Sequence, residues 1–234
     1  RIVVMDAAYH GGLLYFGHGG EALLAPFDFT RIEFNCTDLD RVDGLGAIDD
    51  TVAAVMVEPM MGGAGCIPAT REFLVALRSR CDATGALLVF DEVMTSRMSG
   101  GGVQARLGIT PDLTTLGKYL AGGLTFGAFG GRGDVMAAFD PAAGGELTHG
   151  GTFNNNVVTM AAGAAATGEL LTPEVLDALF ARGEQLQERI AAVLAASPLP
   201  LSVCGLGSLM TIHTVRGPVR APSDLATADP HLKQ

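Results

Sequence analysis

Two short apolar runs in the first half of the chain enclose a segment with helical periodicity. Residues 53–57 and 86–90 are apolar without interruption, which is typical of parallel strands that are covered on both faces. Between the runs, apolar side chains recur at the three- and four-residue spacing of one helix face: Phe73, Leu74, Leu77 and Cys81. We therefore expect a strand, a helix that starts near residues 68–70 and ends at 84–85, and a second strand.

Both predicted strands lead into an acidic residue. Glu58 follows the first strand and Asp91 follows the second. In parallel α/β folds, ligands bind at the carboxyl ends of the strands. The two carboxylates are therefore predicted to lie where chemistry takes place.

The rest of the chain continues this alternation of strands and helices. Further strands are predicted at 2–5, 30–35, 111–116 and 126–131. Helices are predicted at 134–139, 157–170 and 173–196. Thr172 is the expected N-cap of the last helix, with Pro173 at its first position, and Gly100–Gly102 are expected to form a flexible turn.

These elements predict an α/β fold with a mixed, mostly parallel sheet between helices. Pro198 and Pro200 mark a hinge, and residues 201–214 alternate as two strands around a Gly-Leu-Gly turn. We expect a large domain over residues 1–198 and the start of a small C-terminal domain over residues 199–234.

Lysine is rare in this sequence, and one of the two lysines has an unusual setting. Lys118 stands among small and apolar residues after a predicted strand, whereas Lys233 is next to the C-terminal residue. Burial would lower the pKa of the Lys118 amine and make it a better nucleophile. Together with Asp91, it would suit pyridoxal 5′-phosphate (PLP) chemistry, in which a lysine forms a Schiff base and an acid keeps the ring nitrogen protonated. Taken alone, the pair is more simply a surface lysine and a helix-capping aspartate.

Composition narrows the class of protein. The chain has 234 residues, of which 48% are hydrophobic and 17% charged, and this favours a buried core over disorder. Its net charge of −10 argues against nucleic acid or an anionic membrane as a partner. No apolar run is long enough for a membrane span, and the first residues lack the apolar core of a signal peptide. The sequence starts without methionine, so we expect either a processed start or a longer chain.

The cysteines and histidines carry no metal or redox motif. The cysteines are far apart in the sequence, and the five histidines show no ligand spacing. We therefore expect no metal site. The cysteines are expected to act as small core residues in a reducing cytoplasm.

Five ordered segments resemble a known enzyme family. They lie within residues 51–168 at consistent spacing: Val57–Pro59, Leu88–Thr95, Thr110–Lys118, Gly127–Arg132 and Gly151–Asn154. They resemble class III PLP-dependent aminotransferases of fold type I, and look most similar to glutamate-1-semialdehyde aminomutase and its aminotransferase relatives. The resemblance implies the large domain of a fold-type I transferase, a homodimer with its site at the interface, and small amines and keto acids as substrates.

The resemblance assigns roles to four residues of the expected cofactor site. Lys118 matches the lysine that forms the Schiff base and shuttles a proton between substrate and cofactor. Asp91 matches the acid that pairs with the pyridine nitrogen. Tyr9 matches the aromatic residue that stacks on one face of the ring, and Val93 packs against the other face.

Three further matches lie near the ring or across a dimer interface. Glu58 matches a residue close to the ring. Thr152 matches the residue that reaches the cofactor phosphate from the partner subunit. His10 is either a neighbour of the site or an ordinary loop histidine.

The sequence departs from the family's pattern at three places. The family's Gly- and Thr-rich phosphate cup, upstream of Tyr9, falls outside the sequence, and so does the carboxylate-binding arginine of its C-terminal domain. Gly63 stands where ornithine- and GABA-type members carry a glutamate. This glycine favours the aminomutase-like branch.

Three functions remain open. The first is an aminotransferase that moves an amino group from an amine or amino acid to a keto acid or aldehyde in a ping-pong cycle. The second is a 1,2-aminomutase of the glutamate-1-semialdehyde type, which would use the same residues. The third is a non-catalytic PLP-binding fragment. A nucleotide-binding domain is disfavoured because no Gly-x-Gly-x-x-Gly follows the first predicted strand.

Overall fold

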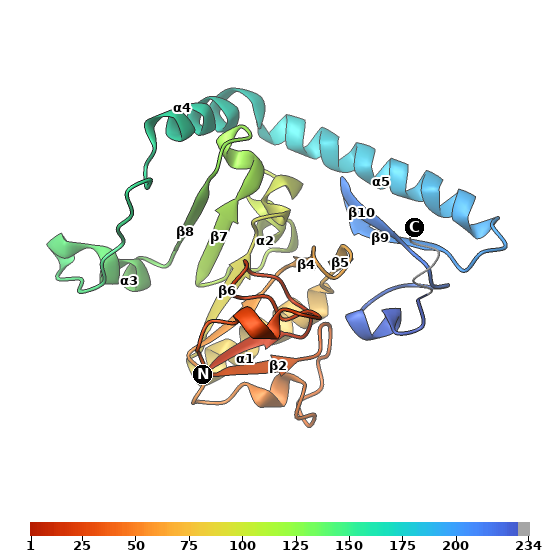
Figure 1. Ribbon diagram of the computed structural model, residues 1–234, viewed down its shortest axis with the longest axis horizontal. Coiled ribbons are helices and arrows are strands. Elements are labelled where there is room, and N and C mark those ends of the chain that lie inside the picture. Colours follow the sequence, from red (N-terminus) through yellow and green to blue (C-terminus); the bar gives the residue numbers. More distant parts are fainter. Residues whose placement is uncertain (229–234) are drawn as a thin grey trace.

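The computed structural model describes residues 1–228, so Lys233 and the end of the predicted small domain lie outside it. Six strands form one sheet in the order β2 (Phe29–Ile32), β1 (Ile2–Met5), β3 (Ala54–Val57), β6 (Leu87–Asp91), β7 (Leu113–Gly117) and β8 (Gly127–Gly131) (Figure 1). Neighbouring strands pair in parallel, except that β8 runs antiparallel to β7. The predicted α/β fold with a mixed, mostly parallel sheet is confirmed.

Helices and two small hairpins complete the described part of the chain. The α-helices are α1 (Arg71–Thr84), α2 (Gly102–Leu107), α3 (Gly133–Met136), α4 (Val157–Ala165) and α5 (Pro173–Ala195). The hairpins pair β4 (Met60–Met61) with β5 (Ile67–Pro68), and β9 (Ser202–Leu206) with β10 (Leu209–His213). Short 3-10 helices lie at Glu21–Leu23, Leu45–Ala47, Thr95–Met98, Lys118–Ala121, Ala137–Phe139, Pro141–Ala143 and Pro222–Leu225.

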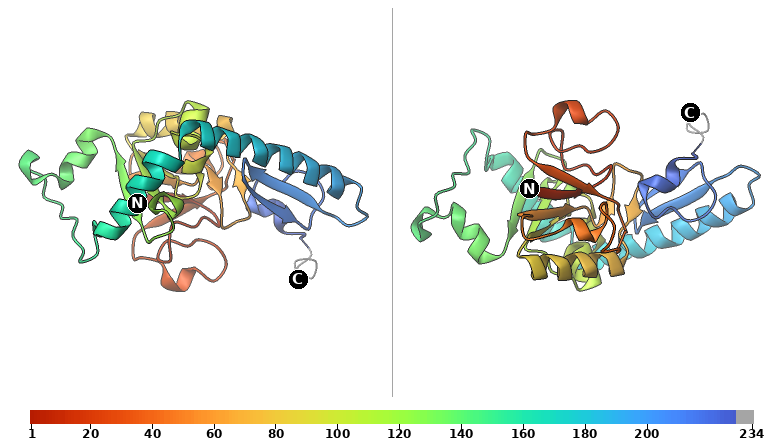
Figure 2. Two further views of the ribbon diagram at one scale, coloured as in Figure 1. Left: turned by 90° about the horizontal axis from the view of Figure 1, so that it is seen from above. Right: turned by 90° about the horizontal axis from the view of Figure 1, so that it is seen from below.

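Helix α3 and the β9–β10 hairpin extend from the sheet region in opposite directions (Figure 1). Figure 1 and Figure 2 show α3 and the loops next to it projecting beyond β8. On the opposite side, the hairpin of β9 and β10 packs against α5. Helix α4 contacts the turn that begins at Lys118, directly after β7.

Strands β3 and β6 and helix α1 form the predicted strand–helix–strand unit. At its N-cap, the Thr70 hydroxyl accepts a hydrogen bond from the Phe73 N–H group (3.2 Å). Gly85 ends the helix in the left-handed conformation with φ of 79°, which glycine adopts at little steric cost. The four side chains predicted to share one face are all buried. Burying a side chain such as Leu or Phe stabilises a fold by about 1.5–3 kcal/mol.

The expected flexible turn at Gly100–Gly102 is only partly correct, because α2 begins at Gly102. The buried Glu92 carboxylate accepts hydrogen bonds from the N–H groups of Val103 (2.8 Å) and Gln104 (2.9 Å). These bonds satisfy backbone donors that a helix start leaves free. The cap comes from a residue outside the helix and its flanks, so the local sequence does not predict it.

The C-terminal part agrees closely with prediction. Thr172 caps α5, and the strands predicted within 201–214 form the hairpin of β9 and β10. The helix predicted over 157–170 is α-helical only as far as α4 extends, and it ends in a π-helical turn, Ala166–Leu170. The domain boundary at residue 198 stays a prediction.

The segment after β10 packs against residues around the sheet. The apolar core contains buried side chains from β1, β3, β6 and α1, together with Val215 and Val219. The Asn35 side chain donates hydrogen bonds to the carbonyl oxygens of Pro68 (3.1 Å) and Arg220 (2.7 Å). Apolar and polar contacts therefore both attach the C-terminal part of the chain to the sheet region.

Asp112 is a buried charge that joins three parts of the fold. Its carboxylate accepts hydrogen bonds from Leu88 N–H in β6 (2.7 Å), from Arg78 in α1 (2.8 Å) and from Arg132 after β8 (2.7 Å). Burial would raise the pKa of Asp112, but the three donors outweigh burial and hold this pKa below its ordinary value. The ionised side chain therefore stabilises the packing of α1 on the sheet.

We predict that Asp112→Asn lowers the free energy of unfolding by about 2–3 kcal/mol at neutral pH, because it weakens charge-assisted hydrogen bonds at a buried position. The pKa of Asp112 is lower in the folded than in the unfolded protein. Its stabilisation is therefore present above about pH 4 and is lost as the pH falls through the folded-state pKa. Urea unfolding of both proteins across this pH range measures the difference.

The matched control is Asp134→Asn, since Asp134 also binds Arg132 but is largely exposed. This variant should lose much less stability, because exposed ion pairs contribute little. Equal losses in the two variants, or a loss in Asp112→Asn that stays constant in acid, would contradict the role given to Asp112.

Candidate active site

A cavity of about 740 Å³ opens where strands β3 and β6 end. Its lining includes five of the six residues that the sequence predicts as site residues: Tyr9, Glu58, Asp91, Val93 and Lys118. Val57, the last residue of β3, pairs with Phe90 of β6, so Glu58 and Asp91, which is the last residue of β6, come next in the same register. The parallel sheet thus gathers residues that are far apart in the sequence.

Asp91 is a buried carboxylate in the lining of this cavity. It accepts hydrogen bonds from His10 Nδ1 (2.8 Å), Val93 N–H (3.1 Å) and the Thr115 hydroxyl (3.0 Å). Burial would raise the pKa of Asp91, but the hydrogen bond and charge of His10, with the other two donors, hold this pKa below its ordinary value. A carboxylate has about four acceptor sites, so Asp91 can accept one further hydrogen bond from a ligand in the cavity.

His10 is buried against Asp91. The sequence leaves open whether His10 is a neighbour of the site or an ordinary loop histidine, and this burial favours the first. The His10 side chain has no exposed surface. Its Nδ1 must carry the hydrogen, because a carboxylate only accepts. Its Nε2 is buried and has no hydrogen-bond partner among residues 1–228. His10 is therefore a neighbour of the site, and its hydrogen bond and charge help to lower the pKa of Asp91.

Glu58 holds two backbone segments beside the cavity. One carboxylate oxygen accepts a hydrogen bond from Tyr9 N–H (3.1 Å), and the other accepts one from Gly62 N–H (3.0 Å). Burial raises the pKa of Glu58 above its ordinary value, and the charge of nearby His10 opposes only part of this effect. The contacts of Glu58 thus fix the backbone from which Tyr9 extends.

Tyr9 and Val93 give the cavity apolar surface. Tyr9 is 46% exposed, and its ring contacts Tyr15 edge-on with the centroids 5.5 Å apart. Val93 is held next to Asp91 by its own N–H group. Met94 and Phe129 extend the lining. Apolar and aromatic side chains of this kind suit a flat ring as ligand.

Lys118 lines the cavity but is exposed, so the predicted burial of its amine is wrong for this chain. The residue begins a 3-10 helix at the end of β7, where the cavity meets solvent, and its φ is +54°. Such a backbone conformation is uncommon for a residue with a side chain and often occurs at functional sites. Lys118 is therefore a candidate site residue because of its position in the cavity lining, and not because its amine is desolvated.

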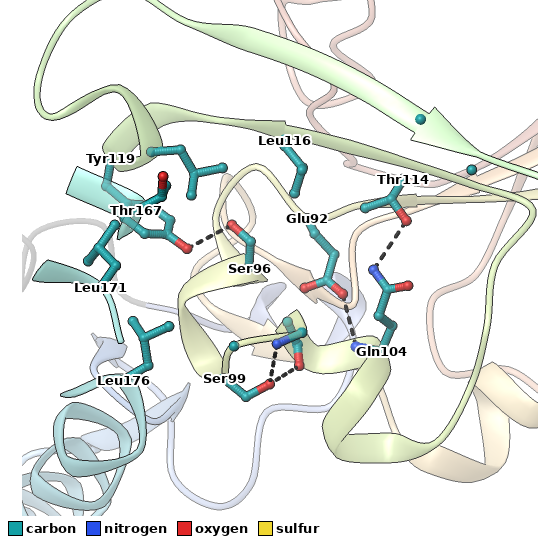
Figure 3. A pocket seen from close by; sticks show the side chains of 16 residues that line it. Glu92, Ser96, Ser99, Gln104, Thr114, Leu116, Tyr119, Thr167, Leu171 and Leu176 are labelled. Carbon is teal, nitrogen blue, oxygen red and sulfur yellow. Dashed lines mark hydrogen bonds between the residues drawn. The ribbon is translucent and has the colours of Figure 1, made fainter. Parts of the chain in front are cut away.

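The residue after Lys118 anchors this turn to the protein (Figure 3). The Tyr119 hydroxyl donates a hydrogen bond to Ser96 Oγ (3.1 Å). The Arg97 guanidinium lies over the Tyr119 ring, 4.7 Å from its centroid, a distance at which cation–π attraction is effective. The position of the Lys118 backbone is thus fixed by its neighbour.

A second cavity, of about 440 Å³, lies against the other face of β7 (Figure 3). Side chains alternate between the faces of a strand, so Thr114 faces this cavity while Thr115 bonds to Asp91. The Gln104 side chain donates to the Thr114 hydroxyl (3.1 Å), and Glu92 binds the backbone of α2. These polar groups hold α2 beside β7 and thereby support the strand that leads to Lys118.

Thr152, the sixth predicted site residue, is not among the residues that line the first cavity. It lies in an exposed loop between α3 and α4, beside Phe153, which is 84% exposed. The predicted role of Thr152 is in the site of a partner subunit, and this role stays a prediction.

Several residues of the lining are missed by sequence reasoning: Thr115, Gly62, Phe129 and His149. Thr115 could have been found only by knowing the register, in which it pairs with Asp91. His149 and Phe129 contact each other edge-on, with centroids 5.3 Å apart. No local motif signals that contact.

Residues 1–228 contain no cluster of three or more His, Cys, Asp or Glu side chains that could hold a metal ion. Within the same range, no helix combines the length and the hydropathy that a membrane span requires.

Residues 29–228 match the family model described as aminotransferase class-III. The chain belongs to this family of PLP-dependent, fold-type I enzymes. Beta-phenylalanine transaminase from Variovorax paradoxus is 50% identical over 234 residues, which are 100% of this chain and 54% of that protein. Glutamate-1-semialdehyde 2,1-aminomutase from Sorangium cellulosum is 41% identical over 179 residues, which are 76% of this chain and 40% of that protein.

Solved structures agree with the sequence comparison. The crystal structure of a beta-phenylalanine aminotransferase from Variovorax paradoxus has a TM-score of 0.94 at 51% identity, and the match covers 100% of this chain and 54% of that one. A glutamate-1-semialdehyde aminomutase from Pseudomonas aeruginosa has a TM-score of 0.80 at 25% identity, covering 99% and 55%. The chain thus spans about half the length of the relatives that it matches. The relative at 50% identity is named as a transaminase, and the relative named as an aminomutase is less similar, at 41%.

We predict that His10→Ala raises the pKa of Asp91, because the substitution removes the hydrogen bond and charge that oppose burial. NMR titration of the Asp91 carboxyl carbon, without cofactor, measures this pKa. His10→Asn is the control, since the Asn amide can donate from nearly the place of Nδ1 and should keep the pKa closer to that of the wild type. If Asp91 titrates alike in His10→Ala and the wild type, His10 does not control its charge.

Proposed function

We propose that this chain forms the cofactor-binding part of a PLP-dependent aminotransferase, which moves an amino group from an amine or amino acid to a keto acid or aldehyde. One observation carries the proposal: Lys118 and an ionised, buried Asp91 line the same cavity of about 740 Å³. Membership of the class III family supports it.

The residues of the cavity fit PLP. Bound PLP supplies an electron sink that allows an amino group and a carbonyl oxygen to be exchanged. Asp91 would accept a hydrogen bond from the pyridine nitrogen and keep that nitrogen protonated. Tyr9 and Val93 would hold the ring on its two faces. Lys118 would bind the cofactor covalently and move the proton at the substrate carbon that carries the amino group.

The phosphate group of PLP would need hydrogen-bond donors from outside this cavity. Among the described residues that line it, Lys118 is the one Lys or Arg side chain, and its role is at the aldehyde end. We propose that Thr152 of a second copy supplies a phosphate contact in a homodimer. Exposed apolar residues next to Thr152 support an interface there, since Phe153 and Val157 are 84% and 79% exposed.

A 1,2-aminomutase of the glutamate-1-semialdehyde type is the second candidate, because it would use the same residues and because aminomutases are among the relatives. Product analysis distinguishes the two functions. An aminotransferase releases a keto product from the donor and an amine from a separate acceptor, whereas an aminomutase gives a single isomer. An aromatic β-amino acid is the first donor to test, since a relative at 50% identity is named for beta-phenylalanine. A cofactor-holding fragment would give neither product.

We also propose a cytoplasmic location without nucleic-acid or membrane partners. The support is the net charge of −10 and the four free cysteines.

We predict that incubation with PLP and reduction by borohydride leaves a stable adduct on Lys118, found by peptide mass spectrometry. Lys118→Ala should carry no adduct, because its side chain has no amine. Lys233→Ala is the matched control, since Lys233 is the other lysine of the sequence, and it should label as the wild type does. An adduct that survives in Lys118→Ala would refute the assignment.

We predict that Thr152→Val weakens PLP binding roughly tenfold or less, the loss expected for a hydrogen bond to a charged group. Mixing this variant with Lys118→Ala tests whether Thr152 acts across a dimer. A mixed dimer contains one site with both native residues, so part of the tight binding should return. No recovery on mixing would mean that Thr152 acts within its own chain or not at all.

A further inference from the structure

One wall of the candidate active site is a glycine-rich turn without large side chains. Gly62 and Gly63 line the cavity, and the turn closes with a hydrogen bond from Gly65 N–H to the Gly62 carbonyl oxygen (3.1 Å). The turn joins the short strands β4 and β5. Glycine loses more conformational freedom on folding than any other residue. The few contacts that hold this turn therefore matter for its position.

On its inner side, the turn contacts the residues that present the Tyr9 ring. Gly62 N–H donates to Glu58, whose other oxygen accepts from Tyr9 N–H. A Cβ atom on Gly63 would lie 3.2 Å from Tyr9 Cβ, and one on Gly62 would collide with the Met94 sulfur. A shift of the turn is therefore transmitted directly to Glu58 and Tyr9.

On its outer side, the turn is held by His213 from β10. His213 is 1% exposed, and its Nε2 lies 2.8 Å from the Gly65 carbonyl oxygen. Because a carbonyl oxygen only accepts, Nε2 carries the hydrogen and donates it. A Cβ on Gly65 would collide with the imidazole, and Gly65 has φ of +107°, so this close approach requires glycine.

The contact between His213 and Gly65 crosses the fold. His213 is separated from Gly65 by 148 positions, and β5, which follows the turn, packs beside β9. His213 Nδ1 is buried and has no hydrogen-bond partner within residues 1–228. The one hydrogen bond described for this buried ring is therefore the one to the Gly65 carbonyl oxygen, on the outer side of the cavity wall.

We propose that His213 is a positioning residue for the cofactor site. Its Nε2–H group holds the Gly62–Gly65 turn in place. Through the hydrogen bond from Gly62 N–H to Glu58, the position of this turn then fixes Glu58 and the backbone of Tyr9. The inference rests on the proposed function as far as the ligand is PLP. The contacts that connect His213 with Gly62 through Gly65 do not depend on which ligand is bound.

The test compares three variants of the full chain by two measurements. The first is amide hydrogen exchange at Gly62 and Gly65 without cofactor, followed by NMR. The second is the Kd for PLP, measured by absorbance. The variants are His213→Leu, which removes the donor, His213→Gln, whose amide can donate from nearly the place of Nε2, and Ile212→Thr, which alters the exposed neighbour on the same strand.

We expect His213→Leu to speed exchange at Gly62 and to weaken PLP binding, each by roughly three- to tenfold, the effect of one lost hydrogen bond. His213→Gln should restore most of both properties. Ile212→Thr should change neither. If His213→Leu does not fold, His213→Asn replaces it, because the shorter Asn side chain cannot reach the Gly65 carbonyl.

Two results would overturn the proposal. Unchanged exchange at Gly62 in the donor-free variant would show that His213 does not hold the turn. Equal losses in the Gln and Leu variants would show that ring packing, and not the hydrogen bond, is responsible. If the wild-type chain binds no PLP, the proposed function fails, and the exchange measurement still decides whether His213 positions the turn.

Discussion

The parallel pairing of β3, β6 and β7 is the constraint on which the candidate active site depends. The register of β3 against β6 brings Glu58 and Asp91 to the same edge of the sheet, and Asp91 pairs with Thr115 in β7. Lys118 follows directly after β7. Backbone hydrogen bonds between strands, and not attractions among the functional groups, thus set their distances. A slip of one residue would turn Asp91 to the opposite face of the sheet.

Acidic side chains buried around this constraint are satisfied in different ways. The Asp91 carboxylate accepts hydrogen bonds from an imidazole and a hydroxyl group. The Glu92 carboxylate accepts from N–H groups at the start of a helix. The Asp112 carboxylate accepts from two guanidinium groups and a backbone N–H group. A charge taken out of water is costly unless it is paired and hydrogen-bonded. The loss of one donor therefore costs more than the bond itself contributes, because the remaining charge stays buried. The polar groups near the site depend on one another for this reason.

The parts of the fold that could be predicted are those that local pattern and chain order determine. The strand–helix–strand unit could be predicted from periodicity, and Asp91 and Lys118 from their positions at the carboxyl ends of strands. The burial of His10 could not be predicted, because it depends on a contact across 81 positions. The start of α2 depends on Glu92 in the same way. The exposure of Lys118 was mispredicted because apolar neighbours in the sequence do not imply apolar neighbours in space.

The glycine turn beside the cavity has a consequence for how the pocket can diverge in evolution. A Cβ on Gly62 would strike the Met94 side chain and one on Gly65 would strike the His213 ring, so a substitution at either position requires its neighbour to move. Pocket shape can then vary more readily at Gly63, where no added Cβ contact is shorter than 3.2 Å, and at side chains such as Met56 and Phe129. Related enzymes with a different ligand preference would be expected to differ at these positions first, while the turn keeps its glycines at positions 62 and 65.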